Sequence, residues 1–273
     1  MSYFNYFTLD HKGGTTMSYF NFRASEVSRG NNLSIAERAS YISGRTLRDC
    51  YSERTFETLR DDVQHIEVYG PADMPAEYHD LQSLCDALNK AERRRDAQTA
   101  REIRGALPKE LDLEENIRIA RQFALANFVR NGLCVAAAFH EGRNPENLKH
   151  NNPHVHLLVS TRTVDFNGFN PKKAREFNQK RYLYTWREQF ANAINVGYER
   201  NGLDIRVDHR SYRERGIIRI PRNYLSQADW KREQQGIRTP AGDVNREIQK
   251  RNEEIERIHN HELEYTPSVE HDR

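Results

Sequence analysis

Three histidines lie on two apolar segments whose lengths are typical of β-strands. His154 and His156 begin the segment His-Val-His-Leu-Leu-Val-Ser, and His140 ends the segment Cys-Val-Ala-Ala-Ala-Phe-His. Side chains at positions i and i+2 of a strand project from the same face, so His154 and His156 point together. The loop between the segments is rich in Gly, Asn and Pro, which favours an antiparallel hairpin that brings His140 to them. Three imidazoles with open coordination positions are typical of a catalytic metal site.

The type of ligand limits the metal and the class of enzyme. Imidazole nitrogen suits Mn²⁺, Co²⁺, Ni²⁺ or Zn²⁺, and Mg²⁺ is a less natural occupant. His150, in the loop, is an alternative third ligand that we rank below His140. A polar cleft lined by the H-x-H pair, without a metal, is the alternative interpretation. The patterns H-E-x-x-H and C-x-x-C do not occur, which argues against a zinc metalloprotease and a cytosine-deaminase type of site.

Periodic patterns predict the elements that position these residues. Ser34 and Glu37 have the spacing of a capping box, and apolar residues recur after them at helical intervals, so we expect a helix with Tyr41 beside its buried stripe. Further helices are predicted over residues 78–99, 112–131 and 173–200 and from about 242 onward. Strands are predicted over residues 17–24, 101–108, 134–140 and 154–160.

Longer stretches of the sequence resemble the MobA/MobL family of plasmid mobilisation relaxases. Residues 139–162 contain a segment that looks like the family's histidine–hydrophobic–histidine core. Residues 93–111 are similar to its K-D-A-Q-x-A-R-E-[IV]-E-x-A-L-P-x-E-L stretch, and residues 199–211 resemble its E-R-A-G-x-D-x-R-[IV]-D-H-R-[ST] segment. The matches run from about residue 17 to residue 238, and their combined specificity is high.

The resemblance implies an α+β fold, in which a central antiparallel β-sheet is flanked by α-helices and followed by a charged helical tail. It also implies an enzyme that nicks one DNA strand at a plasmid origin of transfer. The residues that match the family's metal ligands are His140, His154 and His156, the catalytic tyrosine matches Tyr41, and Glu102 matches an acid that orients or deprotonates. The family usually has a second acid two residues further on, where this chain has Arg104, so Glu102 would act alone.

A tyrosine and a metal are sufficient for this chemistry. A free tyrosine hydroxyl has a pKa near 10 and is a poor nucleophile at neutral pH. On a helix, Arg38 (i−3) and Arg45 (i+4) share the face of Tyr41, and we expect their charges to favour its phenolate and to hold the phosphate. A metal on the histidines would polarise the phosphate and neutralise growing charge. Attack would form a 5′-phosphotyrosine and free a 3′-hydroxyl. Tyr51 is the alternative nucleophile.

The implied cofactor and partners follow from this reaction. We expect a divalent cation, Mn²⁺ or Mg²⁺ first, with Zn²⁺, Co²⁺ and Ni²⁺ as alternatives. The substrate would be single-stranded DNA at an origin of transfer, and accessory mobilisation proteins and a coupling protein would be further partners. Ten basic and five acidic residues lie between Arg200 and Arg238, which favours phosphate binding there, and we expect Arg206 and Arg210 to contact DNA.

Composition and length bound the organisation of the chain. The 273 residues are 30% charged, and their mean hydropathy is −0.93, so we expect one compact domain with highly solvated helical material. The expected boundaries are an extension over 1–16, a relaxase domain over 17–240 and a charged helical tail over 241–273. Residues 17–22 nearly repeat the start of the chain, so translation could start at Met1 or at Met17. Three cysteines without a C-x-x-C pair, no secretory signal and no apolar run of membrane-spanning length predict a cytoplasmic protein without membrane insertion.

Two other functions compete with the relaxase. A rolling-circle replication initiator or a single-strand transposase would share the chemistry, but Tyr41 precedes the histidines in this chain, which favours a relaxase. A catalytically inactive DNA-binding protein that represses its own promoter is the alternative from another class.

Overall fold

The computed structural model describes residues 9–10, 16–142, 151–223 and 225–264. The described residues divide into two compact units, one that ends at His209 and one that begins at Arg210. His150, the alternative third ligand, lies outside the described residues. The domain boundaries predicted from the sequence stay predictions.

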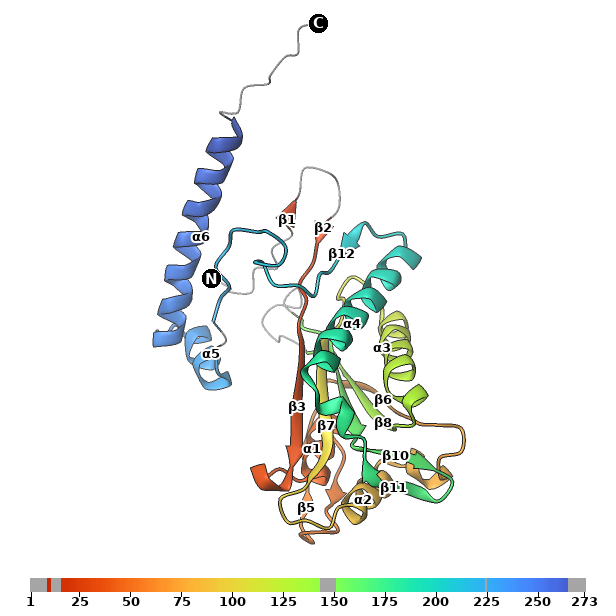
Figure 1. Cartoon of the computed structure of the whole chain (residues 1–273). Coiled ribbons are helices and arrows are strands. Elements are labelled where there is room, and N and C mark those ends of the chain that lie inside the picture. Colours follow the sequence, from red (N-terminus) through yellow and green to blue (C-terminus); the bar gives the residue numbers. More distant parts are fainter. Residues whose placement is uncertain (1–8, 11–15, 143–150, 224, 265–273) are drawn as a thin grey trace, which may run out of the picture. The chain divides into compact units, whose positions relative to one another are not determined.

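A five-stranded sheet in the order β3-β7-β9-β8-β6 forms the centre of the first unit (Figure 1). Its strands are β3 (Phe22–Ser28), β6 (Val63–Tyr69), β7 (Gln98–Ala106), β8 (Val135–His140) and β9 (His154–Ser160). All four neighbouring pairs are antiparallel. With helices on both faces, this sheet confirms the predicted α+β class.

Three of the predicted strands appear close to their expected positions as β7, β8 and β9, and β8 pairs with β9 in antiparallel fashion as predicted. The strand predicted over 17–24 is wrong in its first half. Met17 belongs to β2 (Thr16–Met17), which pairs with β1 (Leu9–Asp10) and with β12 (Ile205–Arg206) in a separate small sheet. The central sheet is joined only from Phe22, which lies opposite Gly105 of β7. Strand β6 was not predicted, because its apolar residues do not alternate regularly with polar ones.

The four helices predicted before residue 209 are present: α1 (Ile35–Ser43), α2 (Leu81–Ala91), α3 (Leu113–Asn127) and α4 (Lys180–Arg200). The Ser34 hydroxyl caps α1 by accepting from the amides of Ala36 and Glu37. Helix α2 is shorter than predicted because Asp80 caps it, after a 3₁₀ turn, and it ends at Ala91. Helix α4 starts later than predicted because Lys173 ends the hairpin of β10 (Arg162–Asp165) and β11 (Gly168–Lys173), and a 3₁₀ turn over Arg175–Asn178 follows it.

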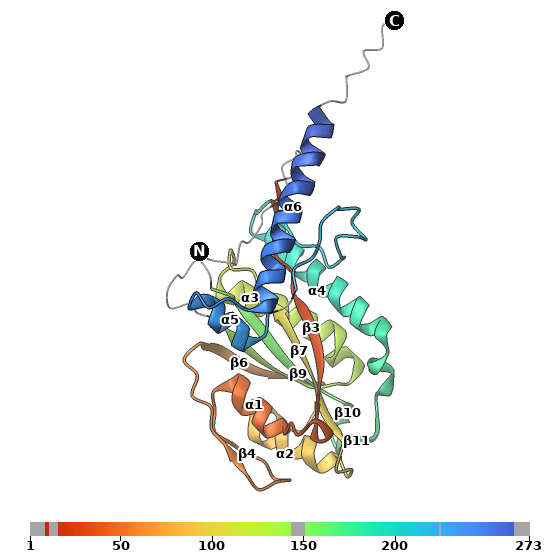
Figure 2. The ribbon, with the colours of Figure 1, turned by 90° about the vertical axis from the view of Figure 1, so that its left-hand side faces the viewer.

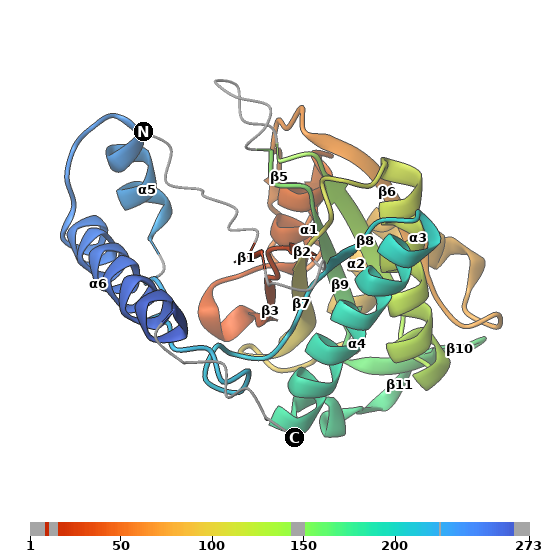
Figure 3. The same cartoon turned by 90° about the horizontal axis from the view of Figure 1, so that it is seen from above.

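The helices divide into two layers, one on each face of the sheet. Helices α3 and α4 cover one face, called the α3/α4 face here (Figure 3). Helices α1 and α2 cover the other, the α1/α2 face (Figure 2). Alternation along β9 follows this division. Val155, Leu157 and Val159 pack in the core of the α3/α4 face, whereas Leu158 packs in the core of the α1/α2 face. His154 and His156 share the parity of Leu158 and therefore belong to the α1/α2 face.

The second unit contains α5 (Gln227–Gln234) and α6 (Pro240–Glu264). Arg246 of α6 forms an ion pair with Glu233 of α5, with 2.7 Å between Nη1 and Oε2. Asn252 hydrogen-bonds the backbone of Ile220 in both directions. The charged helix that the sequence predicts from about residue 242 is therefore present as α6. No helix in the described part of the chain is both long and apolar enough to cross a membrane.

Candidate functional site

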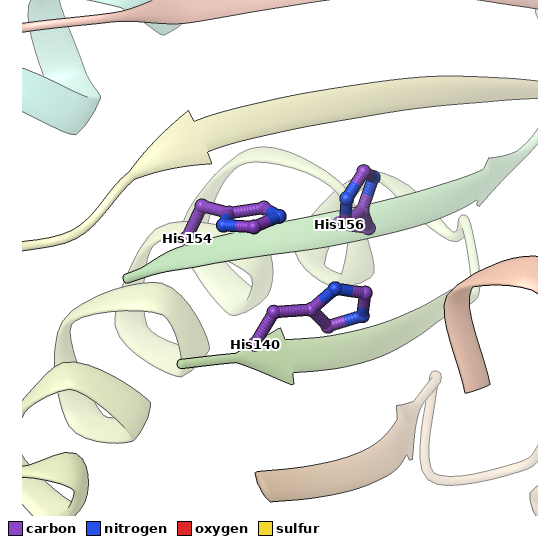
Figure 4. Close-up of side chains that lie close together, drawn as sticks. All are labelled: His140, His154 and His156. Carbon is purple, nitrogen blue, oxygen red and sulfur yellow. The ribbon is translucent and has the colours of Figure 1, made fainter. Parts of the chain in front are cut away.

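The pairing of β8 with β9 brings the three histidines together. His140 lies opposite His154, and Ala138 lies opposite His156, on the α1/α2 face. Their ring centroids are 4.8 to 5.1 Å apart, and Figure 4 shows the rings facing one another across the two strands. One candidate ligand atom from each ring lies within 4.8 Å of the others. All three side chains are buried.

Each ring has one nitrogen held by an acceptor outside the cluster. The Nδ1–H of His154 donates to the carbonyl of Asn152 at 2.7 Å, and the Nδ1–H of His156 donates to Oε1 of Glu102 at 2.6 Å. The Nε2–H of His140 donates to the carbonyl of Ile42 at 2.7 Å. These acceptors select the tautomer in which the other nitrogen carries a lone pair.

The remaining nitrogens form a ligand set. They are Nδ1 of His140 and Nε2 of His154 and His156. Nδ1 of His140 is buried and makes no hydrogen bond among the described residues. A buried nitrogen without a hydrogen-bond partner is costly unless something else binds it. Three convergent imidazole nitrogens therefore fit a divalent metal ion with open coordination positions.

Burial keeps these imidazoles neutral, as metal ligation requires. It lowers the pKa of His140 to about 4, with a further contribution from His156. It also lowers the pKa of His154 to about 2, and the positive charge of Arg104 contributes to that shift. The pKa of His156 is lowered by burial too, although the hydrogen bond to Glu102 opposes this.

Glu102 of β7 joins the cluster to α1. Its carboxylate accepts two hydrogen bonds from Arg38, at 2.6 Å from Nε and 2.5 Å from Nη2, besides the one from His156. Burial alone would raise the pKa of Glu102, but the hydrogen bonds from His156 and Arg38 outweigh it and lower that pKa to about 2. A carboxylate with so low a pKa is a weak base, and it stays charged and keeps its hydrogen bonds to Arg38 and His156.

Tyr41 lies on α1 beside the cluster. Its side chain is 41% exposed, whereas its neighbour Ile42 is buried. The Ile42 carbonyl is in the last turn of α1, where carbonyls lack helical partners, and it accepts from His140 instead. The guanidinium of Arg38 lies 4.5 Å from the centroid of the Tyr41 ring, and that of Arg60 lies 4.9 Å away. The end of α1 thus joins the tyrosine to the histidines.

Arg60 and Asp62 are site residues that the sequence reasoning missed. Asp62 accepts two hydrogen bonds from Arg60, at 2.8 and 2.7 Å. It also lies 3.9 Å from Nδ1 of His140, measured to its Oδ2. The pairing of β6 with β8 places it there, because Val63 lies opposite His140. An arginine and an aspartate in a loop before an unpredicted strand carry no pattern that would have identified them.

The prediction that Arg45 shares the helical face of Tyr41 is wrong. Helix α1 ends at Ser43, and Gly44 adopts a left-handed conformation with φ of 65°. The chain therefore leaves the helix axis before Arg45, and Arg45 interacts electrostatically with Asp80. Arg60 occupies the place beside Tyr41 that was expected for Arg45.

The other predicted residues lie elsewhere. Arg206 of β12 forms an ion pair with Glu199 at 3.1 Å and donates to backbone carbonyls of its own segment. Arg210 belongs to the second unit, and its contact with DNA stays a prediction. Tyr51, the alternative nucleophile, stacks on Arg29, with the guanidinium 3.7 Å from the ring centroid. Arg29 follows the end of β3 that is remote from the histidines, so Tyr51 lies at the opposite end of the sheet.

Comparison with known proteins agrees with this architecture. The model of the MobA/MobL family matches residues 33–235. The conjugal transfer protein TraA of Agrobacterium fabrum is 29% identical over an alignment of 281 positions, gaps included. The alignment covers 89% of this chain and 24% of TraA. Mobilization protein A of Escherichia coli is 29% identical, over 94% of this chain and 36% of that protein. The chain thus spans between a quarter and about a third of the length of these relatives.

A solved structure has the same fold. It is described as the molecular basis of vancomycin resistance transfer in Staphylococcus aureus, and it aligns with a TM-score of 0.64 at 27% identity. The alignment covers 71% of this chain and 100% of that chain. The family match covers most of the chain and includes α1, the β7 acid and all three histidines, so the chain belongs to the MobA/MobL family.

Proposed function

We propose that this chain is the nicking domain of a conjugative mobilisation relaxase, which cleaves one DNA strand at a plasmid origin of transfer. One observation carries the proposal: three uncommitted ring nitrogens converge on the sheet face that also holds an exposed, arginine-flanked tyrosine. The names of the relatives, a conjugal transfer protein and a mobilization protein, support it.

In the proposed reaction, the phenol oxygen of Tyr41 attacks a phosphodiester of single-stranded DNA. The new bond joins that oxygen to phosphorus, and the bond from phosphorus to the 3′-oxygen breaks. Tyrosine loses its proton and the departing 3′-oxygen gains one, so no net proton is consumed. The product is a 5′-phosphotyrosine with a free 3′-hydroxyl, and attack by that hydroxyl would reseal the strand.

His140, His154 and His156 would hold a divalent cation, Mn²⁺ or Mg²⁺ in our proposal. When bound, such an ion polarises a non-bridging phosphate oxygen and offsets the charge that grows during attack. Nitrogen ligands alone do not distinguish Mn²⁺ from Zn²⁺, Co²⁺ or Ni²⁺.

Glu102 acts in this proposal as a positioning residue. With a pKa of about 2 and three donors on its two oxygens, it would orient His156 and Arg38 and would accept the tyrosine proton poorly. The guanidinium groups of Arg38 and Arg60, 4.5 and 4.9 Å from the centroid of the Tyr41 ring, would hold that ring beside the metal ligands. The single acid is sufficient for this orienting role.

The test is a search for a covalent adduct. The full chain is mixed with Mn²⁺ and single-stranded oligonucleotides that tile the plasmid around its gene, and SDS-resistant protein–DNA adducts are separated on a gel. We expect an adduct with the wild-type chain, loss of the adduct with Tyr41→Phe, and an unchanged adduct with Tyr51→Phe. Tyr51 is a matched control, since it is similarly exposed and also lies against an arginine, but far from the histidines.

An adduct that persists in Tyr41→Phe would overturn the nucleophile assignment. Absence of an adduct under every divalent metal, together with sequence-specific binding, would favour an autorepressor. Accessory mobilisation proteins and a coupling protein stay predictions.

A further inference from the structure

Most of the positive charge around Tyr41 is already neutralised. Glu102 binds Arg38 through two hydrogen bonds, and Asp62 binds Arg60 in the same way. Guanidinium groups held by carboxylates contribute fewer free donors to a substrate. A basic side chain without a carboxylate partner would therefore add to the binding of a phosphate near Tyr41.

Arg104 of β7 supplies that cation. It lies opposite His156 of β9 and shares the face of the histidines. Electrostatic interactions with Tyr41, Glu102 and His154 place its charge within the site. Its side chain is exposed, and no described acid forms an ion pair with it. Arg104 is therefore a charge that faces both the tyrosine and the metal ligands without a carboxylate of its own.

A second arginine stands directly beside it on the edge strand. Arg23 of β3 lies opposite Arg104, and it is also exposed. Like charges directly opposite each other in an antiparallel pair are destabilising, typically by a few tenths of a kcal/mol up to about 1 kcal/mol. The electrostatic interaction between these two groups is repulsive. An anion between them would remove this repulsion.

We propose that Arg104 and Arg23 form a cross-strand arginine pair that binds successive phosphates of single-stranded DNA. Arg104 contacts the phosphate that Tyr41 attacks, and Arg23 contacts the next phosphate toward the open edge of the sheet. Arginine suits this role because its planar guanidinium binds phosphate through two parallel hydrogen bonds. β3 is an edge strand and its residues 23–26 are exposed, so the DNA can leave the site across this part of the sheet. This inference rests on the proposed function for the identity of the ligand.

The experiment measures binding without cleavage. The probe is a fluorescein-labelled oligonucleotide from the tiling set, the one that the wild-type chain binds most tightly. Fluorescence anisotropy is followed in EDTA, in the full-length Tyr41→Phe background, at several salt concentrations. Variants Arg104→Gln, Arg23→Gln and the double variant are compared with Arg181→Gln. Arg181 is an exposed arginine of α4, on the opposite face of the sheet, and serves as the control.

Arg104→Gln is expected to weaken binding about tenfold and to reduce the slope of log affinity against log salt by about 0.7, as loss of one single-strand phosphate contact should. The double variant should lose about twice that slope, and Arg181→Gln should match the background. Thermal unfolding of each variant checks that it folds. Unchanged affinity and slope in folded Arg104→Gln would overturn the arginine pair.

The two proposals fail in different ways. If the wild-type chain forms no covalent adduct but Arg104→Gln loses affinity and slope, the arginine pair stands and the nicking activity does not. If the adduct forms but the arginine variants bind like the background, the nicking activity stands and the arginine pair does not.

Discussion

The two faces of the central sheet are made by the same strands but have different chemistry. On the α3/α4 face the core is aromatic, with ring centroids of Phe22, Phe123 and Phe190 between 5.1 and 5.8 Å apart. On the α1/α2 face the same strands present imidazoles, a carboxylate and arginines. Val155, fully buried in the aromatic core, separates two histidines of the other face. Because neighbouring residues of a strand point to opposite faces, the same strands contribute core residues to one face and candidate site residues to the other.

The two faces also differ in the size of the side chains that fill them. Aromatic side chains fill the α3/α4 face, and the Phe190 ring lies so close to Gly105 that a Cβ there would be 2.6 Å from it. On the other face, Ala106 and Ala138 lie opposite His154 and His156. These small residues leave room beside the two imidazoles. We expect substitutions on the first face to change stability and substitutions on the second to change binding.

The largest expected effect is on the aromatic face. Phe190→Ala should lower the free energy of unfolding by about 3 to 5 kcal/mol, because it leaves a cavity among well-packed rings. Urea denaturation measures this, and Mn²⁺ affinity of the folded fraction should stay unchanged. Tyr184→Ala, on the same helix but 61% exposed, should change stability by less than about 0.5 kcal/mol. Equal effects of the two substitutions would contradict the division between the faces.

The next largest effect is on the histidine face. His154→Ala removes one of three ligands and should weaken Mn²⁺ binding more than about 100-fold, beyond the effect of an outer-shell change. It should abolish the covalent adduct and leave oligonucleotide affinity within several-fold. Calorimetric titration with Mn²⁺ measures the first quantity. His65→Ala is the control, since His65 lies opposite Phe139, on the other face. Unimpaired nicking by His154→Ala would refute the metal assignment.

A smaller effect is expected at Asp62. Asp62→Asn keeps the shape but removes the charge that anchors Arg60 and faces His140, so Mn²⁺ affinity and the rate of adduct formation should each fall about tenfold. The matched control is Asp96→Asn. Asp96 binds Arg94 with the same spacing and two hydrogen bonds, but at an exposed position away from the site. If both variants behave like the wild-type chain, Asp62 has no part in the site.

The smallest effect expected is that of pH on metal affinity. His140 and His154 have folded pKa values of about 4 and about 2, so neither ring takes up a proton at about pH 5.5. The Mn²⁺ dissociation constant should therefore change less than about threefold between about pH 7.5 and 5.5. Ordinary histidines, with a pKa near 6.5, would each lose about tenfold over that interval. A loss of that size in calorimetric titrations would show that the rings are not desolvated.

The same low pKa values should make the stability of the metal-free chain depend on pH. As the pH falls below about 6.5, the unfolded chain takes up protons on these histidines and the folded chain does not. The free energy of unfolding should therefore fall with pH over that range.

Local sequence patterns were sufficient for much of the site. The i and i+2 spacing of His154 and His156 places them on one face whatever the rest of the chain does. The Ser34 cap and the apolar positions after it correctly predicted the start of α1 and the exposed position of Tyr41. These features depend on backbone geometry over a few residues, which the sequence specifies directly.

The pairing of strands that are far apart in the sequence decided the rest of the site. The order β3-β7-β9-β8-β6 brings Asp62 to His140 and Arg23 to Arg104, although these partners are 78 or more residues apart in sequence. The turn at Gly44 removes Arg45 from the site and leaves its place to Arg60. Which strands become neighbours depends on how the whole core packs, and no local pattern encodes that choice.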